Sequence, residues 1–146
     1  MSTGTALLSG NRHRTTLRLV RRVAAWLVGV YLARMYVEQG LVKLDPEGFW
    51  KEVFALWGYP AWLCTTVGVL EVAGGLAILL PWVAGYGSLA LLAVMTGAAV
   101  TRIGDGRWVD VAWLVAYSIA LAWIAWEWWP WRSRPSQPFR RSGWRD

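Results

Sequence analysis

Four long apolar runs, separated by short connections, limit what this chain can fold into more than any other feature of its sequence. The runs cover residues 23–44, 61–80, 83–101 and 108–129. Each approaches the roughly 20 mostly apolar residues that a helix needs to cross a bilayer. They fill most of a chain of 146 residues that is 56% hydrophobic and contains 13 Trp. We therefore expect one all-α, polytopic membrane domain over residues 17–131, without a second soluble domain.

The connections predict how these four helices are arranged. Pro-Trp at residues 81–82 forms a very tight link between the second and third runs, and Gly-Asp-Gly at residues 104–106 has the composition of a turn. Short links join helices that run in opposite directions, so the expected fold is a four-helix bundle with up-down-up-down topology. A seam of small residues on the third run, formed by Ala93, Gly97 and Thr101, suits close helix packing.

The first connection is long enough to form a helix of its own. Asp45 is a good N-cap, Pro46 suits the first helical position and Gly58 suits the C-terminal stop. Between them, aromatic and aliphatic side chains fall on one helical arc and charged side chains on the other. This pattern predicts a short amphipathic helix on the outer membrane surface, with its aromatic face toward lipid. The alternative is a cap over the mouth of the bundle.

Charge is distributed unevenly along the chain, whose formal net charge is +6. The arginines that flank the apolar domain are Arg12, Arg14, Arg18, Arg21 and Arg22 before it, and Arg132, Arg134, Arg140, Arg141 and Arg145 after it. By the positive-inside rule, we expect a membrane protein with both termini in the cytoplasm. Residues 1–16 and 132–146 are expected to be disordered basic tails that attract anionic lipid head groups. Nucleic acid is not an expected partner, because no folded basic surface remains to bind it.

Three charged residues stand inside the apolar runs. Arg34 and Glu38 lie one helical turn apart in the first run, and Glu71 lies in the middle of the second. A charge at bilayer depth costs at least ~2.5 kcal/mol on insertion scales, so such residues usually serve a function or are paired. At the expected helix depths, other polar residues gather with them in the middle and outer half of the bundle. The predicted polar cluster consists of Arg34, Glu38, Lys43, Glu71, Asp110 and Tyr117.

This cluster has two interpretations. In the structural one, Arg34 pairs with Glu38 or Glu71, and the network fixes how the helices dock. In the functional one, the cluster lines a cavity that opens toward the outer leaflet and binds a polar head group. Arg34 then supplies hydrogen-bond donors, and Glu71 can take up or release a proton. One network can serve both purposes.

The residue types that are missing from the sequence restrict its chemistry. The chain has one His, His13 in the basic tail, and one Cys, Cys64. It therefore has no intramembrane histidine pair for a haem, no ligands for an iron–sulfur cluster and no metal-binding spacing. No catalytic residue can be assigned, and whether the chain belongs to an enzyme is left open. Any redox role requires a diffusible quinone or a partner subunit.

Two short motifs resemble those of a known family. Gly-x-x-Lys-Leu ends the first run at residues 40–44, and Glu-x-x-Gly-Gly follows in the second run at residues 71–75. In this order, in a four-span chain of this length, they resemble the DoxX family of small four-helix bacterial membrane proteins over about residues 20–128. The family is named for a membrane subunit of a thiosulfate:quinone oxidoreductase. Its relatives are associated with membrane redox complexes and with thiol and oxidative-stress handling. The resemblance implies a multi-pass protein of the bacterial cytoplasmic (inner) membrane.

The resemblance implies roles for individual positions. The family's charged and close-packing positions correspond here to Lys43, Glu71, Gly40, Gly74 and Gly75. Arg34 and Glu38 depart from the mostly apolar stretch that the family has there, which indicates a feature particular to this chain.

Two functional hypotheses follow. In the first, the chain is a quinone-linked membrane subunit of an oxidoreductase complex, and its polar cluster binds a quinone or a lipid-like head group. In the second, it is a non-catalytic accessory subunit that stabilises a larger assembly of membrane proteins.

Overall fold

The computed structural model describes residues 4–129, and the side chains of residues 16–129. Within this part of the chain there are five α-helices and no strand, so the predicted all-α class is confirmed. The helices are α1 (Gly4–Leu44), α2 (Phe49–Leu56), α3 (Ala61–Ile78), α4 (Ala84–Gly104) and α5 (Trp108–Glu127).

Three of the described helices are long and apolar enough to cross a membrane, namely α3, α4 and α5. They correspond to the second, third and fourth apolar runs. The first run lies within α1, whose mean hydropathy is lowered by Arg34, Glu38 and Gln39. Helix α1 also extends back to Gly4, so residues 4–16, which the sequence assigns to a disordered tail, are helical here. The predicted tail at residues 132–146 lies outside the described residues.

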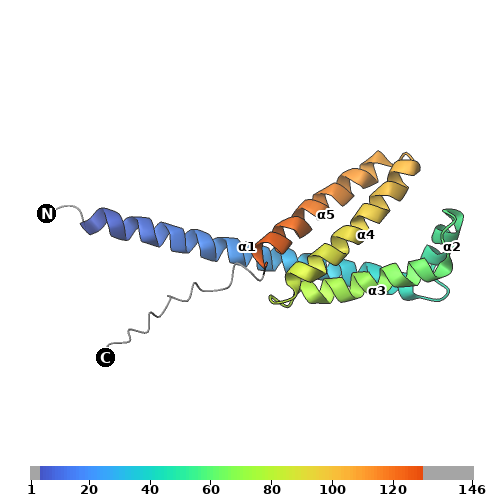
Figure 1. The fold of residues 1–146 in the computed structure, drawn as a ribbon, viewed down its shortest axis with the longest axis horizontal. Helices are drawn as coiled ribbons and strands as arrows, with labels where there is room; N and C mark the ends of the chain where they lie inside the picture. The colour runs from blue at the N-terminus through green and yellow to red at the C-terminus, as the bar shows by residue number, and fades with distance from the viewer. Residues whose placement is uncertain (1–3, 130–146) are drawn as a thin grey trace, which may run out of the picture.

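The long helices pack in the order of the sequence, with α1 on α3, α3 on α4 and α4 on α5. Helices α1 and α3 run in opposite directions, because Gly40 of α1 meets Gly68 of α3 while Ala33 meets Gly75. Figure 1 shows α4 and α5 leaving α1 and α3 at an angle, so that the two pairs converge at one end and diverge at the other. We call the divergent end the α2 end, and the convergent end the α3–α4 end.

The interface between α1 and α3 is a contact of backbone against backbone. A Cβ atom placed on Gly40 would lie 2.6 Å from the carbonyl oxygen of Gly68, and one placed on Gly75 would lie 3.0 Å from that of Ala33. Any side chain at Gly40 would therefore force the helices apart. Small residues of this kind allow close helix approach in membrane proteins, where no hydrophobic drive brings helices together.

The interface between α3 and α4 is similarly close. A Cβ atom on Gly74 would lie 2.8 Å from Cγ of Leu91, and one on Gly87 would lie 2.6 Å from Cβ of Ala77. The sequence places Gly97 among the packing glycines, and this prediction is wrong. A Cβ atom on Gly97 would have nothing within 4 Å. The reason is that α4 has already diverged from α3 at this level.

The α3–α4 end is closed by packing and by an ion pair. Nε of Arg21 on α1 lies 2.9 Å from Oε2 of Glu127 on α5. The void beside this contact, lined in part by Ala25 and Ile124, holds only about 10 Å³. The helices are thus tightly joined at this end and have room to separate only toward the α2 end.

Helix α2 begins later than the sequence predicts. Its N-cap is Gly48, without a side-chain cap, so Asp45 and Pro46 do not start the helix. Oδ1 of Asp45 instead accepts a hydrogen bond from the backbone N–H of Glu47 at 3.1 Å, which forms a local turn. The predicted stop at Gly58 is correct, because its φ of 76° is a left-handed conformation that favours glycine.

The backbone contact between α1 and α3 predicts that Gly40→Ala lowers the free energy of unfolding by about 1–3 kcal/mol, since the methyl group overpacks a rigid interface. Gly97→Ala is the matched control, and it should be neutral or slightly stabilising because its methyl group enters open space. Thermal unfolding of the purified protein in detergent, followed by circular dichroism, measures both. Equal stability of the two variants would contradict this description of the interface.

Candidate functional site

A large open cavity lies between the diverging helix pairs. Its volume is about 810 Å³, and all five helices contribute to its wall. Most of the lining side chains are aromatic or aliphatic, as is usual for small-molecule sites, which range over about 300–1,000 Å³. The polar and aromatic residues of its wall include Tyr31, Tyr36, Gln39, Lys43, Trp50, Trp57, Glu71, Arg102, Asp110, Trp113 and Tyr117.

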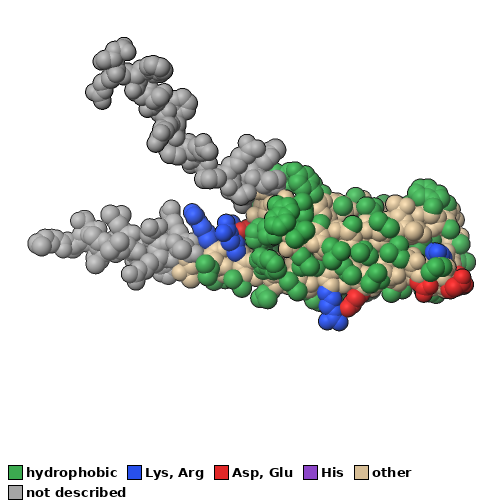
Figure 2. All heavy atoms as spheres, turned by 90° about the horizontal axis from the view of Figure 1, so that it is seen from below, with side chains coloured by type: hydrophobic (Ala, Val, Ile, Leu, Met, Phe, Trp, Pro, Cys, Tyr) green, Lys and Arg blue, Asp and Glu red, His purple; other side chains and the backbone are tan. Residues whose placement is uncertain are grey.

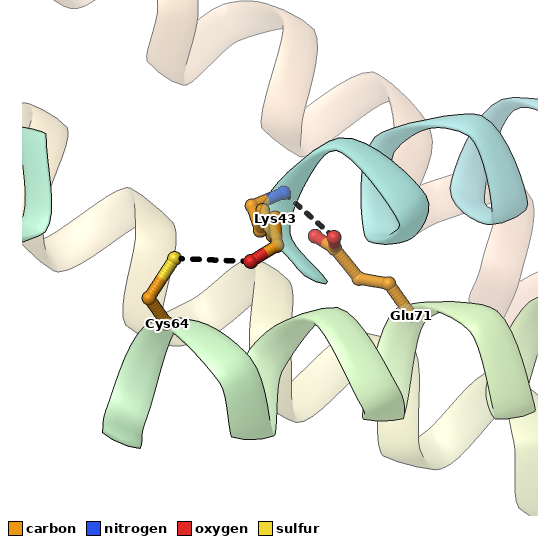
Figure 3. Close-up of polar contacts among 3 residues, drawn as sticks. All are labelled: Lys43, Cys64 and Glu71. Atoms are coloured by element: carbon orange, nitrogen blue, oxygen red, sulfur yellow. Dashed lines mark hydrogen bonds and ion pairs between the residues drawn. The ribbon is translucent and has the colours of Figure 1, made fainter. Parts of the chain in front are cut away.

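The strongest polar contact in this wall is the ion pair between Lys43 and Glu71. Nζ of Lys43, in the last turn of α1, lies 2.6 Å from Oε2 of Glu71, in the middle of α3 (Figure 3). The two residues are only 7% and 3% exposed. Nζ also lies 4.9 Å from the centre of the Trp50 ring of α2, a cation–π contact. The pair therefore joins three helices at one point.

Cys64 contacts the backbone of Lys43, one of the two residues of this ion pair. It is fully buried, and its Sγ–H donates a weak hydrogen bond to the backbone carbonyl of Lys43 at 3.7 Å (Figure 3). Carbonyls in the last turn of a helix have no partner within the helix, so the thiol serves an end of α1 that would otherwise be unsatisfied. Cys64 thus packs and orients the segment that carries Lys43.

Tyr36 supplies an unused hydrogen-bond donor and acceptor. Its side chain is 1% exposed and lines the cavity, yet its hydroxyl has no hydrogen-bond partner among the described residues. A buried polar group without a partner is destabilising by about 1–3 kcal/mol. A bound molecule that hydrogen-bonds to this hydroxyl would remove that penalty.

The sequence does not single out Tyr36 or Gln39, because an aromatic residue in an apolar run normally belongs to the core. The spacing of these two residues relative to Lys43 could have indicated that they share a face with it. Tyr36, Gln39 and Lys43 follow at intervals of three and four, which places them on one face of a helix. All three line the cavity.

The cavity wall near the start of α5 holds a second set of charges. Asp110 lies 2.8 Å from Nε of Arg107 and 3.5 Å from Nη1 of Arg102. One turn and two turns further along α5, Trp113 and Tyr117 face the same cavity, with ring centres 6.4 Å apart. Asp110 and Tyr117 thus lie in the wall that also holds Lys43 and Glu71, as the sequence places them.

Helix α2 closes the divergent end of the cavity. Nε1 of Trp57 donates a hydrogen bond to Oδ2 of Asp105 at 2.9 Å, and the guanidinium of Arg102 lies 5.1 Å from the centre of the Trp57 ring. The hydroxyls of Tyr59 and Thr101 are 3.0 Å apart. These contacts tie the end of α2 to the turn between α4 and α5, across the opening between the helix pairs.

Arg34 and Glu38 are not brought into this site. Nε of Arg34 lies 2.7 Å from Oε1 of Glu38, and their side chains are 79% and 61% exposed. Glu71 pairs with Lys43, so the alternative in which Arg34 pairs with Glu71 is wrong. The reason is angular: the nine helical steps from Arg34 to Lys43 rotate by about 900° in total, which leaves the two side chains on opposite faces of α1.

No group of His, Cys, Asp and Glu with the geometry of a metal site occurs among the described residues. The charged groups in the cavity wall instead neutralise one another in pairs, Lys43 with Glu71 and Arg102 with Asp110. The cavity is therefore apolar with a few local hydrogen-bonding groups, which suits an uncharged or weakly polar head on an apolar molecule.

Comparison with known proteins identifies the family. Residues 20–126 match the DoxX-like family. This chain belongs to that family. No curated protein and no solved structure matches it. The matched region of this DoxX-like protein contains α2 to α4 whole and most of α1 and α5, including Lys43, Glu71 and the packing glycines. Together with its three apolar helices, the family identifies an integral membrane protein.

The burial of the ion pair predicts a distinctive pattern of stabilities in this DoxX-like protein. Lys43→Met and Glu71→Met should each lower the free energy of unfolding by about 3–5 kcal/mol, because each leaves one buried charge without its partner. The double variant should regain most of that loss, since it leaves no charge unpaired. Unfolding in detergent measures all three.

Glu38→Gln is the control, because the exposed pair of Glu38 with Arg34 contributes about 0–1 kcal/mol in a detergent solution that water can reach. Additive losses in the double variant would show that Lys43 and Glu71 do not depend on each other.

Proposed function

We propose that this DoxX-like protein is a four-span subunit of a quinone-linked redox complex in the bacterial cytoplasmic membrane, and that its cavity binds a quinone or a similar lipid-like head group. The proposal has two parts, the placement of the chain in the membrane and the chemistry of the cavity.

The placement in the membrane follows from packing and charge. Helix α1 runs antiparallel to α3 in close contact, so its segment at residues 23–44 lies at the same level as a helix that is apolar enough to span. Exposed basic side chains at the α3–α4 end include Arg18, Arg21 and Arg22. Exposed acidic side chains at the α2 end include Asp45, Glu47, Glu52 and Asp105, against the exposed basic side chain of Arg107. Figure 2 shows mainly basic side chains at one end of the described residues and mainly acidic ones at the other. The positive-inside rule then puts the α3–α4 end and both termini in the cytoplasm, in an up-down-up-down bundle.

The short helix α2 fits the role of an outer cap. Trp50 and Phe54 line the cavity, so the aromatic face turns toward the bundle rather than only toward lipid. Phe49 and Leu56 are exposed and available to the outer membrane interface. The sequence leaves two positions for this helix, one on the outer membrane surface and one as a cap that covers the mouth of the bundle. The contacts of Trp50 and Phe54 favour the cap.

The observation that carries the ligand chemistry is the unpartnered hydroxyl of Tyr36 in the wall of an apolar cavity. A quinone carbonyl oxygen is a hydrogen-bond acceptor, which this hydroxyl or Nζ of Lys43 can donate to. The ring of such a head group can pack against the aromatic side chains of Trp50 or Trp113, and its isoprenoid tail against the aliphatic wall. The residues present therefore fit a quinone.

The chain's own role in this proposal is to bind and orient. With His13 and Cys64 as its single histidine and cysteine, it has no ligand set for a haem or an iron–sulfur cluster. Electrons would pass between the bound quinone and a partner subunit. The basic segment around Arg21 would lie against anionic lipid head groups of the inner leaflet.

A benzoquinone that carries a photoreactive isoprenoid tail tests the proposal in lipid nanodiscs. Labelling should map to the cavity walls. Tyr36→Phe should weaken it by roughly 2–10-fold, the effect of one lost hydrogen bond, without lowering stability. Tyr86→Phe is the matched control, because Tyr86 is an exposed tyrosine outside the cavity and should label like the wild type.

The same experiment with a photoreactive phospholipid separates the two ligand sources. Preferential labelling by the phospholipid would assign the cavity to a lipid. Labelling that is confined to the outer surface, or that is equal in Tyr36→Phe and the wild type, would refute the site and favour a purely accessory subunit.

A further inference from the structure

The pair formed by Arg34 and Glu38 interrupts an otherwise apolar surface of α1. Figure 2 shows a single patch of basic and acidic side chains midway along the apolar face. Residues at helical spacing on both sides of this pair are exposed and apolar: Leu27, Val30, Leu41 and Val42. We call the surface made by these four residues together with Arg34 and Glu38 the α1 stripe.

The level of this pair is fixed by how α1 packs on α3. Gly40 touches Gly68, and Ala33 touches Gly75, so Arg34 and Glu38 lie beside the central part of α3. Because α3 is apolar enough to span a membrane, the two charges lie at the depth of the hydrocarbon. Charges at this depth are normally turned toward protein or a water-filled cavity, whereas these face outward.

The contact within the chain does not use all the hydrogen-bonding capacity of the pair. It joins Nε of Arg34 to Oε1 of Glu38, while a guanidinium carries five N–H donors and a carboxylate accepts at both oxygens. A second carboxylate could therefore bind the same Arg34, and a second guanidinium could bind the same Glu38. At this depth in the membrane, a surface of another protein can supply such a partner.

A second copy of this chain carries the complementary charges at the right depth. Two copies inserted in the same direction are related by a two-fold axis along the membrane normal, which brings the same surface of each together. Arg34 of one copy then lies about 6 Å along the helix direction from the level of Glu38 of the partner subunit. This is the same offset that the pair already bridges within one chain. Each guanidinium can thus contact its own Glu38 and Glu38 of the partner subunit.

We propose that the α1 stripe is a homodimer interface, in which two Arg34–Glu38 pairs form a ring of four charges flanked by apolar side chains. Lys43 lies on the opposite face of α1, so this interface leaves the cavity free and does not depend on what the cavity binds.

Cysteine cross-linking of the full chain in native membranes tests the proposal. Leu41→Cys lies on the α1 stripe and should form a disulfide-linked species of twice the chain mass under mild oxidation. Val100→Cys is the control, because Val100 is similarly exposed but lies on α4, outside the α1 stripe. Cys64 is fully buried and is not expected to react.

The double change Arg34→Leu and Glu38→Leu, made together with Leu41→Cys, then tests the charges. It should reduce the cross-linked dimer roughly tenfold, as expected for losing several interhelical polar contacts. Because it makes α1 more apolar, membrane insertion should be retained, and circular dichroism and gel filtration check that the variant is folded.

Three results would overturn the proposal. One is equal cross-linking through Leu41→Cys and Val100→Cys, the signature of random collision. Another is a Leu41→Cys product of a different mass, or none at all, which would assign the stripe to another protein or to lipid. The third is a dimer that persists unchanged without the two charges.

Discussion

The buried ion pair between Lys43 and Glu71 is the constraint on which the rest of this structure depends. It sits beside the point where the backbones of α1 and α3 touch, at Gly40 and Gly68. A slip of one residue would separate the charges or leave one of them buried alone, a change that is destabilising by about 3–5 kcal/mol. The pair therefore fixes the register of α1 on α3, and these two helices form the layer on which the other elements are arranged.

The cavity follows from how α4 and α5 are attached to that layer. The contact between Arg21 and Glu127 holds the helix pairs together at the α3–α4 end, while small residues on α4, including Gly97, leave space toward the α2 end. Helix α2 lies at the divergent end of that space, where Trp57 is hydrogen-bonded to Asp105 of the turn between α4 and α5. What remains is an apolar volume whose wall includes Tyr36, and the buried hydroxyl of this residue has no hydrogen-bond partner among the described residues. Lys43 and Glu71 of the polar cluster thus fix how the helices dock and also line the cavity that the functional interpretation requires.

Much of this could be predicted from the sequence, and the exceptions have a common cause. Apolar runs predict α3, α4 and α5, and the motif around Glu71 predicts both the family and the importance of that carboxylate. The sequence gives depth along a helix but not which face meets its neighbour. Hence the sequence offers Arg34 as a partner for Glu71, whereas the packing of α1 on α3 places Lys43 there and turns Arg34 outward. Gly97 differs from Gly40 for the same reason, since openness around a glycine depends on where the helices diverge.

The most direct measurement is whether the protein keeps an amphiphile in its cavity when it is purified gently from native membranes, read by native mass spectrometry. Gly97→Trp fills the open space beside Gly97. Gly104→Trp has the same mass and also has nothing within 4 Å, but it lies outside the cavity wall. We expect one bound amphiphile with a carbonyl-bearing head in the wild type and in Gly104→Trp, and none in Gly97→Trp. An empty wild-type protein, or equal retention in all three proteins, would contradict it.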